Sequence, residues 1–262
     1  MRNIRLIIEY DGTNYAGWQV QNNHKEQGPG RRLKTIQETI EGVLQKILQE
    51  KVKVIASGRT DAGVHAVGQT VNFKTNSGFS AAKIQEALNA LLPEDVSVRQ
   101  AKEASDDFHA CRYAKSKLYR YLIFQSKFSS AFTHKHCWHI RQPLDIKLMR
   151  REAKRLLGKH DFKSFCASGS GAKTTVRTIK RIEIKKSMSY KLTANSYPFI
   201  AIDIEAGGFL YNMVRNIVGT LVEIGRGRFD KGSLDKILAA RDRRLAGPTA
   251  PAKGLCLIKV NY

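Results

Sequence analysis

Acidic residues are scarce in this sequence. Asp and Glu number 23 among 262 residues, against 45 Lys and Arg, which leaves a formal net charge of +22. An excess of this size repels itself in the folded state, so it favours a protein whose partner is a polyanion such as a nucleic acid. Surface charge that serves only solubility is the plainer alternative, and charge alone does not separate the two.

Long apolar runs and paired cysteines are also missing. The apolar run from Leu6 to Ile8 is interrupted by Glu9 and Asp11 well before it reaches the length of a signal peptide or a membrane span. The four cysteines are widely spaced, and none forms a C-x-x-C pair. We therefore expect a protein of the reduced cytoplasm that has no membrane anchor.

Strand and helix patterns follow one another irregularly along the chain. Strands are predicted over 3–10, 52–57, 69–75, 96–102, 117–125, 136–141, 176–187, 198–206 and 254–260, and helices begin at Thr35, Ser80 and Asp145 and cover 209–224 and 233–240. Because helices do not alternate one for one with strands, the pattern disfavours a doubly wound parallel sheet and favours an α+β fold. No linker-like stretch divides the chain, so we expect two closely packed halves, 1–105 and 106–262.

The segment from Gly58 to Ala66 (GRTDAGVHA) carries the strongest chemical signal. Two glycines bracket Arg59 and Asp61, so a tight loop between two strands can present both side chains. An arginine this close favours the ionised form of the aspartate, and an ionised carboxylate in a cleft can act as a nucleophile or a base. An Asx-turn, in which Asp61 only bonds the amide of Gly63, explains the same residues equally well.

This segment resembles the GRTDxGVHA signature of the tRNA pseudouridine synthase A family. Further blocks of that family occur in the same order along nearly the whole chain: Tyr10 to Thr13, Gly17 to Gln19, Thr35 to Gln37, Phe108 to Ala110, Lys117 to Tyr121, His160 to Phe162, Tyr211 to Gly219, Ala250 to Pro251 and Gly254 to Leu255. One such block is weak, but eight or more in order are specific.

The resemblance implies a fold and a set of site residues. The fold is the pseudouridine synthase fold, an α+β architecture whose two related α/β-sandwich halves share a mixed, mainly antiparallel sheet with a central cleft. Asp61 is implied as the catalytic carboxylate, Tyr119 as the ring that stacks on the target uracil, and Arg215 as the cation that pairs with the aspartate. Arg59, flanked by Gly58 and Thr60, is implied to help hold the substrate nucleotide. Without the resemblance, a core aromatic and an ordinary ion pair explain Tyr119 and Arg215 better.

The implied reaction converts uridine to pseudouridine in the anticodon stem-loop of tRNA, at tRNA positions 38, 39 and 40. It breaks the N-glycosidic bond and rejoins the same base through carbon, so it involves no redox change and requires no cofactor. The base must leave its stack to reach Asp61. The resemblance also implies a homodimer. Whether Asp61 attacks the ribose, adds to the uracil ring or removes a ribose proton stays open.

Three basic clusters are candidates for phosphate contacts. Their members are Lys25, Arg31, Arg32 and Lys34, then Lys173, Arg177, Lys180 and Arg181, and finally Arg241, Arg243 and Arg244. The first cluster lies in a segment, 22–34, that is longer than the usual family connection. It predicts either a loop that contacts RNA or an ordinary surface loop.

Two other classes of function and one metal site compete with this interpretation. A non-catalytic RNA-binding module fits the charge, but an acid such as Asp61 would repel phosphate. A nucleoside hydrolase or glycosidase needs a second carboxylate, for which Asp11 and Asp161 are the candidates. A metal site could draw on His134, His136, Cys137 and His139, but strand alternation sends these residues to opposite faces, so we expect no metal.

Overall fold

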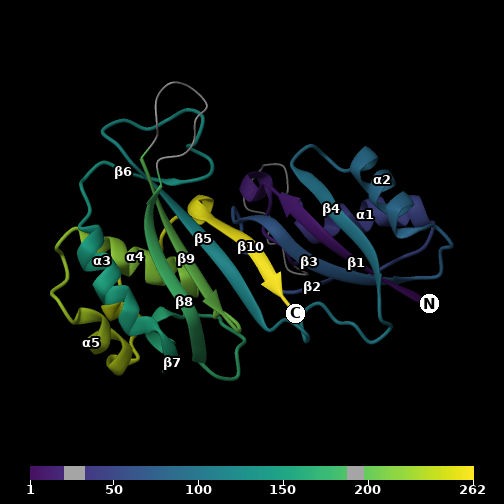
Figure 1. Cartoon of the computed structure of the whole chain (residues 1–262). Coiled ribbons are helices and arrows are strands. Elements are labelled where there is room, and N and C mark those ends of the chain that lie inside the picture. Colours follow the sequence, from purple (N-terminus) through teal and green to yellow (C-terminus); the bar gives the residue numbers. More distant parts are fainter. Residues whose placement is uncertain (21–32, 188–197) are drawn as a thin grey trace. The chain divides into compact units, whose positions relative to one another are not determined.

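A computed structural model describes residues 1–20, 33–187 and 198–262 (Figure 1). The chain divides into two compact units. Unit 1 consists of Met1–Lys115 together with Leu257–Tyr262, and unit 2 consists of Ser116–Cys256. We describe each unit by itself.

Unit 1 is a sheet covered by two helices. Its strands are β1 (Arg2–Tyr10), β2 (Ile55–Ala56), β3 (His65–Thr75), β4 (Val96–Ala104) and β10 (Leu255–Asn261), with the order β4-β1-β3-β10 and β2 paired to β3. β1 runs antiparallel to both β3 and β4. Figure 1 shows α1 (Ile36–Leu48) and α2 (Ala81–Leu91) together on one side of these strands.

The core of unit 1 follows from period-two alternation in β1. Ile4, Leu6 and Ile8 are completely buried, and Ile40 and Leu44 of α1 are completely buried as well. Alternate strand residues point to the same face, so one face of β1 supplies the sheet side of this core and the apolar stripe of α1 supplies the helix side.

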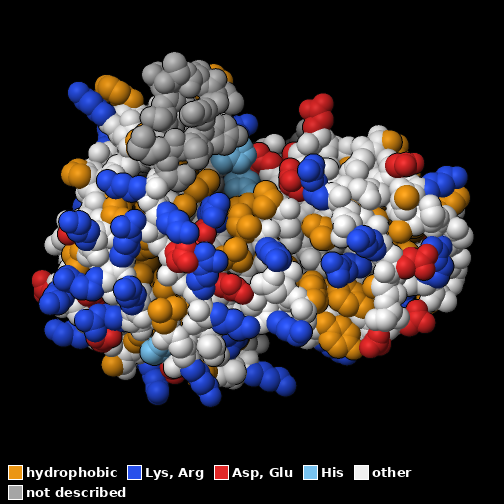
Figure 2. Space-filling view, in the orientation of Figure 1, with side chains coloured by type: hydrophobic (Ala, Val, Ile, Leu, Met, Phe, Trp, Pro, Cys, Tyr) orange, Lys and Arg blue, Asp and Glu red, His pale blue; other side chains and the backbone are white. Residues whose placement is uncertain are grey.

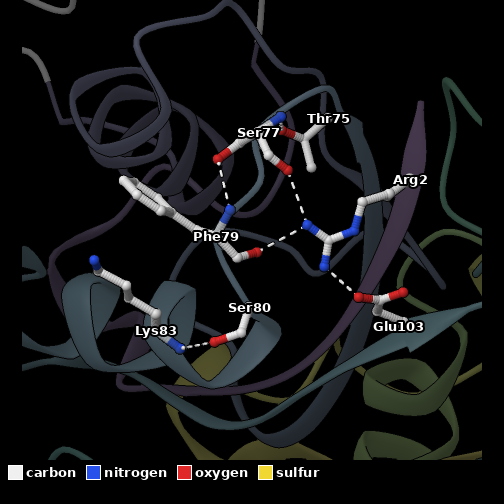
Figure 3. A network of polar contacts seen from close by, with 7 residues as sticks. All are labelled: Arg2, Thr75, Ser77, Phe79, Ser80, Lys83 and Glu103. Atoms are coloured by element: carbon white, nitrogen blue, oxygen red, sulfur yellow. Dashed lines mark hydrogen bonds and ion pairs between the residues drawn. The ribbon is translucent and has the colours of Figure 1, made fainter.

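Arg2 fixes the segment that leads from β3 into α2 (Figure 3). Its Nη1 donates hydrogen bonds to the carbonyl oxygens of Ser77 at 2.8 Å and Phe79 at 2.9 Å, and its Nη2 bonds Glu103 of β4. The Ser80 hydroxyl then accepts from the Lys83 amide at 3.2 Å and caps α2.

Among its described residues, unit 2 contains five strands and three helices. Its strands are β5 (Ser116–Gln125), β6 (Trp138–Ile140), β7 (Gly158–Asp161), β8 (Val176–Ser187) and β9 (Phe199–Ala206), in the order β5-β9-β8-β7. β5 pairs with β9, β9 with β8 and β8 with β7, all antiparallel, whereas β6 runs parallel to β5, so the sheet is mixed and mainly antiparallel. The helices are α3 (Ile146–Ala153), α4 (Met213–Gly225) and α5 (Ser233–Ala240).

Helix α4 is the central packing element of unit 2. Apart from Arg215, every residue of α4 is buried. A Cβ on Gly219 would overlap the carbonyl oxygen of Pro248, and one on Gly247 would lie 2.7 Å from the Cα of Thr220. Glycine is therefore required where the segment before β10 crosses α4.

The α+β class and nearly every predicted element are confirmed. The capping box of Thr35 and Glu38 is present at the start of α1, and Ser80 and Asp145 cap α2 and α3 as expected. Three bounds were wrong by several residues. The strand predicted over 52–57 is reduced to β2, and the strand predicted from 69 begins at His65. The helix predicted from 209 begins at 213, because Asn212 adopts a left-handed conformation with φ of 58°. None of the helices in the described ranges is long and apolar enough to cross a membrane.

Candidate active site

The loop that carries Asp61 connects β2 to β3 in unit 1. The Ser57 amide continues the strand pairing by donating to the carbonyl oxygen of Thr70 at 2.8 Å. The chain then turns, and the Val64 amide donates to the carbonyl oxygen of Asp61 at 3.1 Å. Gly63 takes a φ of 75° inside this turn, which a residue with a side chain adopts only with strain.

Side chains from the neighbouring strands fix both ends of the loop. The side-chain Nε2 of Gln69 donates to the carbonyl oxygen of Gly58 at 2.8 Å, and its Oε1 accepts from the Ser57 hydroxyl at 2.6 Å. The Tyr10 hydroxyl lies 2.9 Å from the Thr60 hydroxyl in a buried contact. The loop is therefore held on each side of Arg59.

Two glycines of the preceding segment allow the loop to sit close to its own unit. A Cβ on Gly17, which has a φ of 90°, would lie 2.7 Å from the Thr60 carbonyl oxygen. A Cβ on Gly12 would overlap the carbonyl oxygen of Val64. The Trp18 amide donates to the same Thr60 carbonyl at 3.0 Å. The blocks 10–13 and 17–19 thus build the bed of the loop, a role that the sequence pattern did not reveal.

Burial divides the side chains of the loop. Thr60 is buried, Asp61 is half-buried and Arg59 is exposed. A main-chain bond from the Val64 amide closes the turn at Asp61. This arrangement presents a partly desolvated carboxylate on a rigid loop, next to an exposed cation.

Asp11 and His65 flank the same loop. Asp11 Oδ1 accepts from the amide and the hydroxyl of Thr13, at 2.9 and 2.5 Å. His65 Nδ1 lies 3.0 Å from Asp11 Oδ1 and 3.1 Å from the Gly12 nitrogen. One nitrogen cannot both donate to the carboxylate and accept from the amide, so the tautomer decides which contact is a hydrogen bond. With either tautomer of His65, Asp11 stabilises the turn through its hydrogen bonds from Thr13.

Tyr119 belongs to β5 of unit 2. It pairs with Ile204 of β9, and only 6% of its surface is exposed. Its ring meets the ring of Phe209 edge to face, with centroids 5.2 Å apart. This contact orients the Tyr119 ring. The family resemblance implies that this ring stacks on the target uracil.

Arg215 is the half-buried residue of the otherwise buried helix α4. Its Nε donates to the carbonyl oxygen of Ala250 at 2.8 Å, and its Nη1 donates to Asn212 Oδ1 at 2.9 Å. The Ala250 amide returns a bond to the Arg215 carbonyl at 3.1 Å. The left-handed Asn212 and the 250–251 block therefore aim the guanidinium.

The structure places the predicted site residues in two groups. Gly58, Arg59, Thr60 and Asp61 lie together in unit 1, and Tyr119 on β5 and Arg215 on α4 lie in unit 2. Burial of the Tyr121 ring, two residues along β5 from Tyr119, raises the pKa of its hydroxyl far above the usual value. Tyr121 donates to the Pro251 carbonyl oxygen at 2.8 Å, so it ties β5 to the block that anchors Arg215.

The predicted basic clusters differ in how their cations are used. Lys25, Arg31 and Arg32 lie outside the described residues. Lys34, Lys173 and Lys180 are exposed, and Figure 2 shows Lys and Arg side chains gathered over β7, β8 and α3 of unit 2. The exposed members Arg181, Arg241 and Arg244 form ion pairs with Glu183, Asp161 and Asp242.

Arg243 stabilises unit 2 through hydrogen bonds of its guanidinium. Its Nη1 donates to the Gly247 carbonyl at 2.9 Å, and its Nη2 donates to Asn216 Oδ1 at 3.0 Å and to Thr249 at 3.1 Å. Burial lowers the pKa of this guanidinium. Its donors are directed into unit 2, which argues against the phosphate contact proposed from the sequence.

The second carboxylates considered from the sequence already have structural partners. In unit 2, Asp161 Oδ1 accepts from the hydroxyl of Thr175 at 2.5 Å and from the amide of Lys163 at 3.1 Å, and Oδ2 faces Arg241 at 3.1 Å. Asp11 holds the turn in unit 1. Neither acid is arranged as the general acid of a glycosidase.

The histidine-rich segment does not follow the strand geometry assumed from the sequence. β6 begins after His134 and His136, which lie in a turn, so the alternation argument was wrong for these two residues. His134 Nδ1 lies 2.6 Å from the Ala131 carbonyl oxygen, and His139 Nε2 lies 2.8 Å from that of Ser126. These two rings serve local hydrogen bonds.

Comparison with known proteins identifies the chain. It matches the family described as tRNA pseudouridine synthase over residues 6–114 and 153–262. It is 45% identical over 262 residues to a protein named tRNA pseudouridine synthase A from Thermoanaerobacter sp. (strain X514) and to one from Acetivibrio thermocellus, and 44% identical to one from Geotalea uraniireducens. Each alignment covers 100% of both chains.

Similarity at this level over the full length defines an RNA-modifying isomerase with the pseudouridine synthase fold. The chain belongs to the tRNA pseudouridine synthase family. The family predicted from the motif blocks is thereby confirmed. The non-catalytic RNA-binding module and the nucleoside hydrolase are set aside, because the family's activity is isomerisation.

Proposed function

We propose that the enzyme converts uridine to pseudouridine in the anticodon stem-loop of tRNA, at tRNA positions 38, 39 and 40, with Asp61 as the catalytic carboxylate. The observation that carries the proposal is the rigid presentation of Asp61. Main-chain bonds hold the loop on both sides of this half-buried acid, so its position costs little further ordering when substrate binds.

Asp61 suits each chemical route open to the reaction. The N-glycosidic bond of the target uridine breaks, the uracil turns, and its carbon 5 bonds to the anomeric carbon while the proton on carbon 5 leaves. A carboxylate can stabilise or capture the ribose cation, add to the ring, or remove a proton. No oxidant or reductant enters, because the product is an isomer of the substrate.

Tyr119 and Arg215 are proposed to complete the site. A ring fixed by Phe209 can stack on an extruded uracil, which compensates for part of the stacking lost on leaving the RNA helix. Arg215 is held by two hydrogen bonds and would pair with the Asp61 carboxylate, which favours its ionised form. Arg59 would bind the phosphate next to the flipped nucleotide, and the amides of Gly58 and Thr60 would border it.

The division of roles follows the two halves, 1–105 and 106–262. The first is proposed to carry the catalytic loop, and the second to complete the site and much of the RNA surface. We further propose that the enzyme acts as a homodimer in the cytoplasm, where its tRNA substrate is found.

The test is pseudouridine mapping on unmodified tRNA transcripts incubated with the wild-type enzyme or with Asp61→Ala. New pseudouridine in the anticodon arm with the wild type alone is the expected result. Pseudouridine elsewhere in the tRNA would overturn the proposed target, and equal product from Asp61→Ala would overturn the proposed role of Asp61. Free uracil as product would indicate hydrolysis instead.

A further inference from the structure

A cavity of about 540 Å³ lies in unit 1, bordered by the segment that enters β2, by β3 and by the segment after β4. Asp61 and the rest of its loop do not line it. Four cations are among its lining residues: Lys51, Lys53, Lys74 and Arg112. The volume is in the range of pockets that hold small ligands.

These four cations are exposed and have no acidic partner within the part of the chain that the structure describes. This contrasts with β8, where Arg181 and Lys185 both pair with Glu183. Like charges gathered around one hollow repel each other, so an anion that enters the hollow gains from all of them.

The floor of the cavity is rigid. Asn72 donates to the Phe108 carbonyl oxygen at 3.2 Å and accepts from the Ala110 amide at 2.9 Å. Asn3 donates to the same Phe108 carbonyl at 2.9 Å, and Tyr262 donates to the Ala110 carbonyl at 2.9 Å. The block 108–110 belongs to the family pattern, yet it takes no part in the site built around Asp61.

The wall after this block adds an imidazole and an aromatic ring. His109 Nδ1 accepts from the amides of Cys111 and Arg112 at 3.2 and 3.3 Å, so its Nε2 is the nitrogen left to donate. The ring of Tyr113 stacks on Phe108 with an angle of 25° between the planes and is 47% exposed. Cations beside an exposed aromatic are the usual surface for a nucleotide.

Two acids also line the cavity. Asp107 accepts from the Tyr113 hydroxyl at 2.9 Å, and a hydrogen bond from Ser105 together with this bond holds the pKa of the Asp107 carboxyl below its ordinary value. Asp106 has no hydrogen-bond or ion-pair partner among the described residues. Four cations against two carboxylates leave an excess of two positive charges.

We propose that this cavity binds the phosphate backbone of the tRNA substrate at a nucleotide other than the uridine that reacts. The inference rests on the proposed function for its choice of polyanion. Lys53 and Lys74 contact phosphate, and Tyr113 packs against the sugar or base beside it. The site contributes to affinity and not to the chemical step, because it contains none of the residues assigned to that step.

The experiment compares the wild type with a double variant that carries both Lys53→Gln and Lys74→Gln. The matched control is Lys46→Gln together with Lys83→Gln, since both lysines are exposed on the helices of unit 1 and lie outside the cavity. Binding of an unmodified tRNA transcript is measured over a range of salt concentrations, and pseudouridine formation is measured at limiting and saturating tRNA. Thermal unfolding checks that each variant is folded.

For the cavity variant we expect tRNA binding roughly 10-fold weaker near physiological salt and a salt dependence shallower by about 1.5 in slope, because two phosphate contacts are lost. KM should rise while kcat at saturating tRNA stays at the wild-type value. An affinity and slope equal to those of the control would overturn the proposal. A change in molar mass in solution with unchanged tRNA affinity would overturn it as well.

Asp106→Asn should change tRNA affinity in the opposite direction. Removing this carboxylate should tighten tRNA binding about 2-fold at low salt, whereas the same change at the exposed Glu86 of α2, Glu86→Gln, should alter it less. Equal effects would indicate long-range charge alone and contradict a local site. If the wild type bound tRNA through the cavity but formed no pseudouridine, the proposed function would fail while this site would stand.

Discussion

The Asp61 loop and the Arg215 guanidinium are held in different ways. The loop is positioned by its backbone: main-chain bonds reach it from Trp18 and Thr70, and glycines at 12 and 17 permit close approach. Arg215 is positioned by its own side chain, through Asn212 and the Ala250 carbonyl. We therefore expect a substitution of Asp61 to leave these backbone contacts in place, whereas changing Arg215 removes the anchor and the charge together.

The largest expected effect comes from Asp61→Asn, which keeps the shape of the side chain and removes its charge. Pseudouridine formation should fall by about 10³-fold or more, because the variant lacks the carboxylate that we propose as the reacting group. Rates under single-turnover conditions measure the change. Thermal unfolding should match that of the wild type, and the exposed control Asp230→Asn should keep full activity.

Gly17→Ala should disturb the backbone that holds the loop. Its φ of 90° and the 2.7 Å approach to the Thr60 carbonyl make any Cβ unfavourable, so the free energy of unfolding should fall by about 2–3 kcal/mol. Denaturant unfolding measures this. Gly42→Ala is the matched control in α1, where a Cβ meets nothing within 4 Å, and it should raise stability by about 0.5–1 kcal/mol. Equal effects at the two positions would show that the loop bed tolerates a Cβ.

Arg215→Lys tests the side-chain anchor. Lysine keeps the charge but lacks the planar fork, so the two bonds to Ala250 and Asn212 are not both reproduced. We expect the free energy of unfolding to fall by about 1 kcal/mol and the rate to fall by about 10-fold or more. The same change at the exposed Arg99, which forms a long ion pair with Glu9 at 3.7 Å, should leave both quantities unchanged. A fully active Arg215→Lys would show that charge alone suffices.

The smallest effect concerns the ion pairs on β8. Hydrogen bonds from Arg181 and then Lys185 lower the pKa of Glu183 to about 2. Because the folded pKa is depressed, the stabilising contribution is complete above the ordinary value of 4.5 and is lost as pH falls through about 2. Glu183→Gln should therefore unfold at nearly the wild-type temperature below pH 2 and slightly below it at pH 6. A difference that grew as pH fell would contradict this sign.

Much of the fold was predictable because it depends on neighbours in sequence. The alternation in β1 and the capping box of Thr35 are local patterns, and both elements formed where they were expected. The start of α4 was missed because Asn212 takes a left-handed backbone conformation, which the apolar pattern over 209–224 does not signal. The two-residue length of β2 was missed because pairing with β3, a contact distant in sequence, decides where β2 ends.

The sequence by itself determined the family, the α+β class and the identity of Asp61 as the acid to test, because motif residues and local periodicity are written along the chain. Only the tertiary structure decided that Gly12 and Gly17 form the bed of the Asp61 loop, that Arg243 is used inside unit 2, and that four cations with no acidic partner among the described residues line one cavity. These facts depend on approaches between residues far apart in the chain. Steric exclusion and charge pairing act through space, so sequence spacing alone does not reveal them.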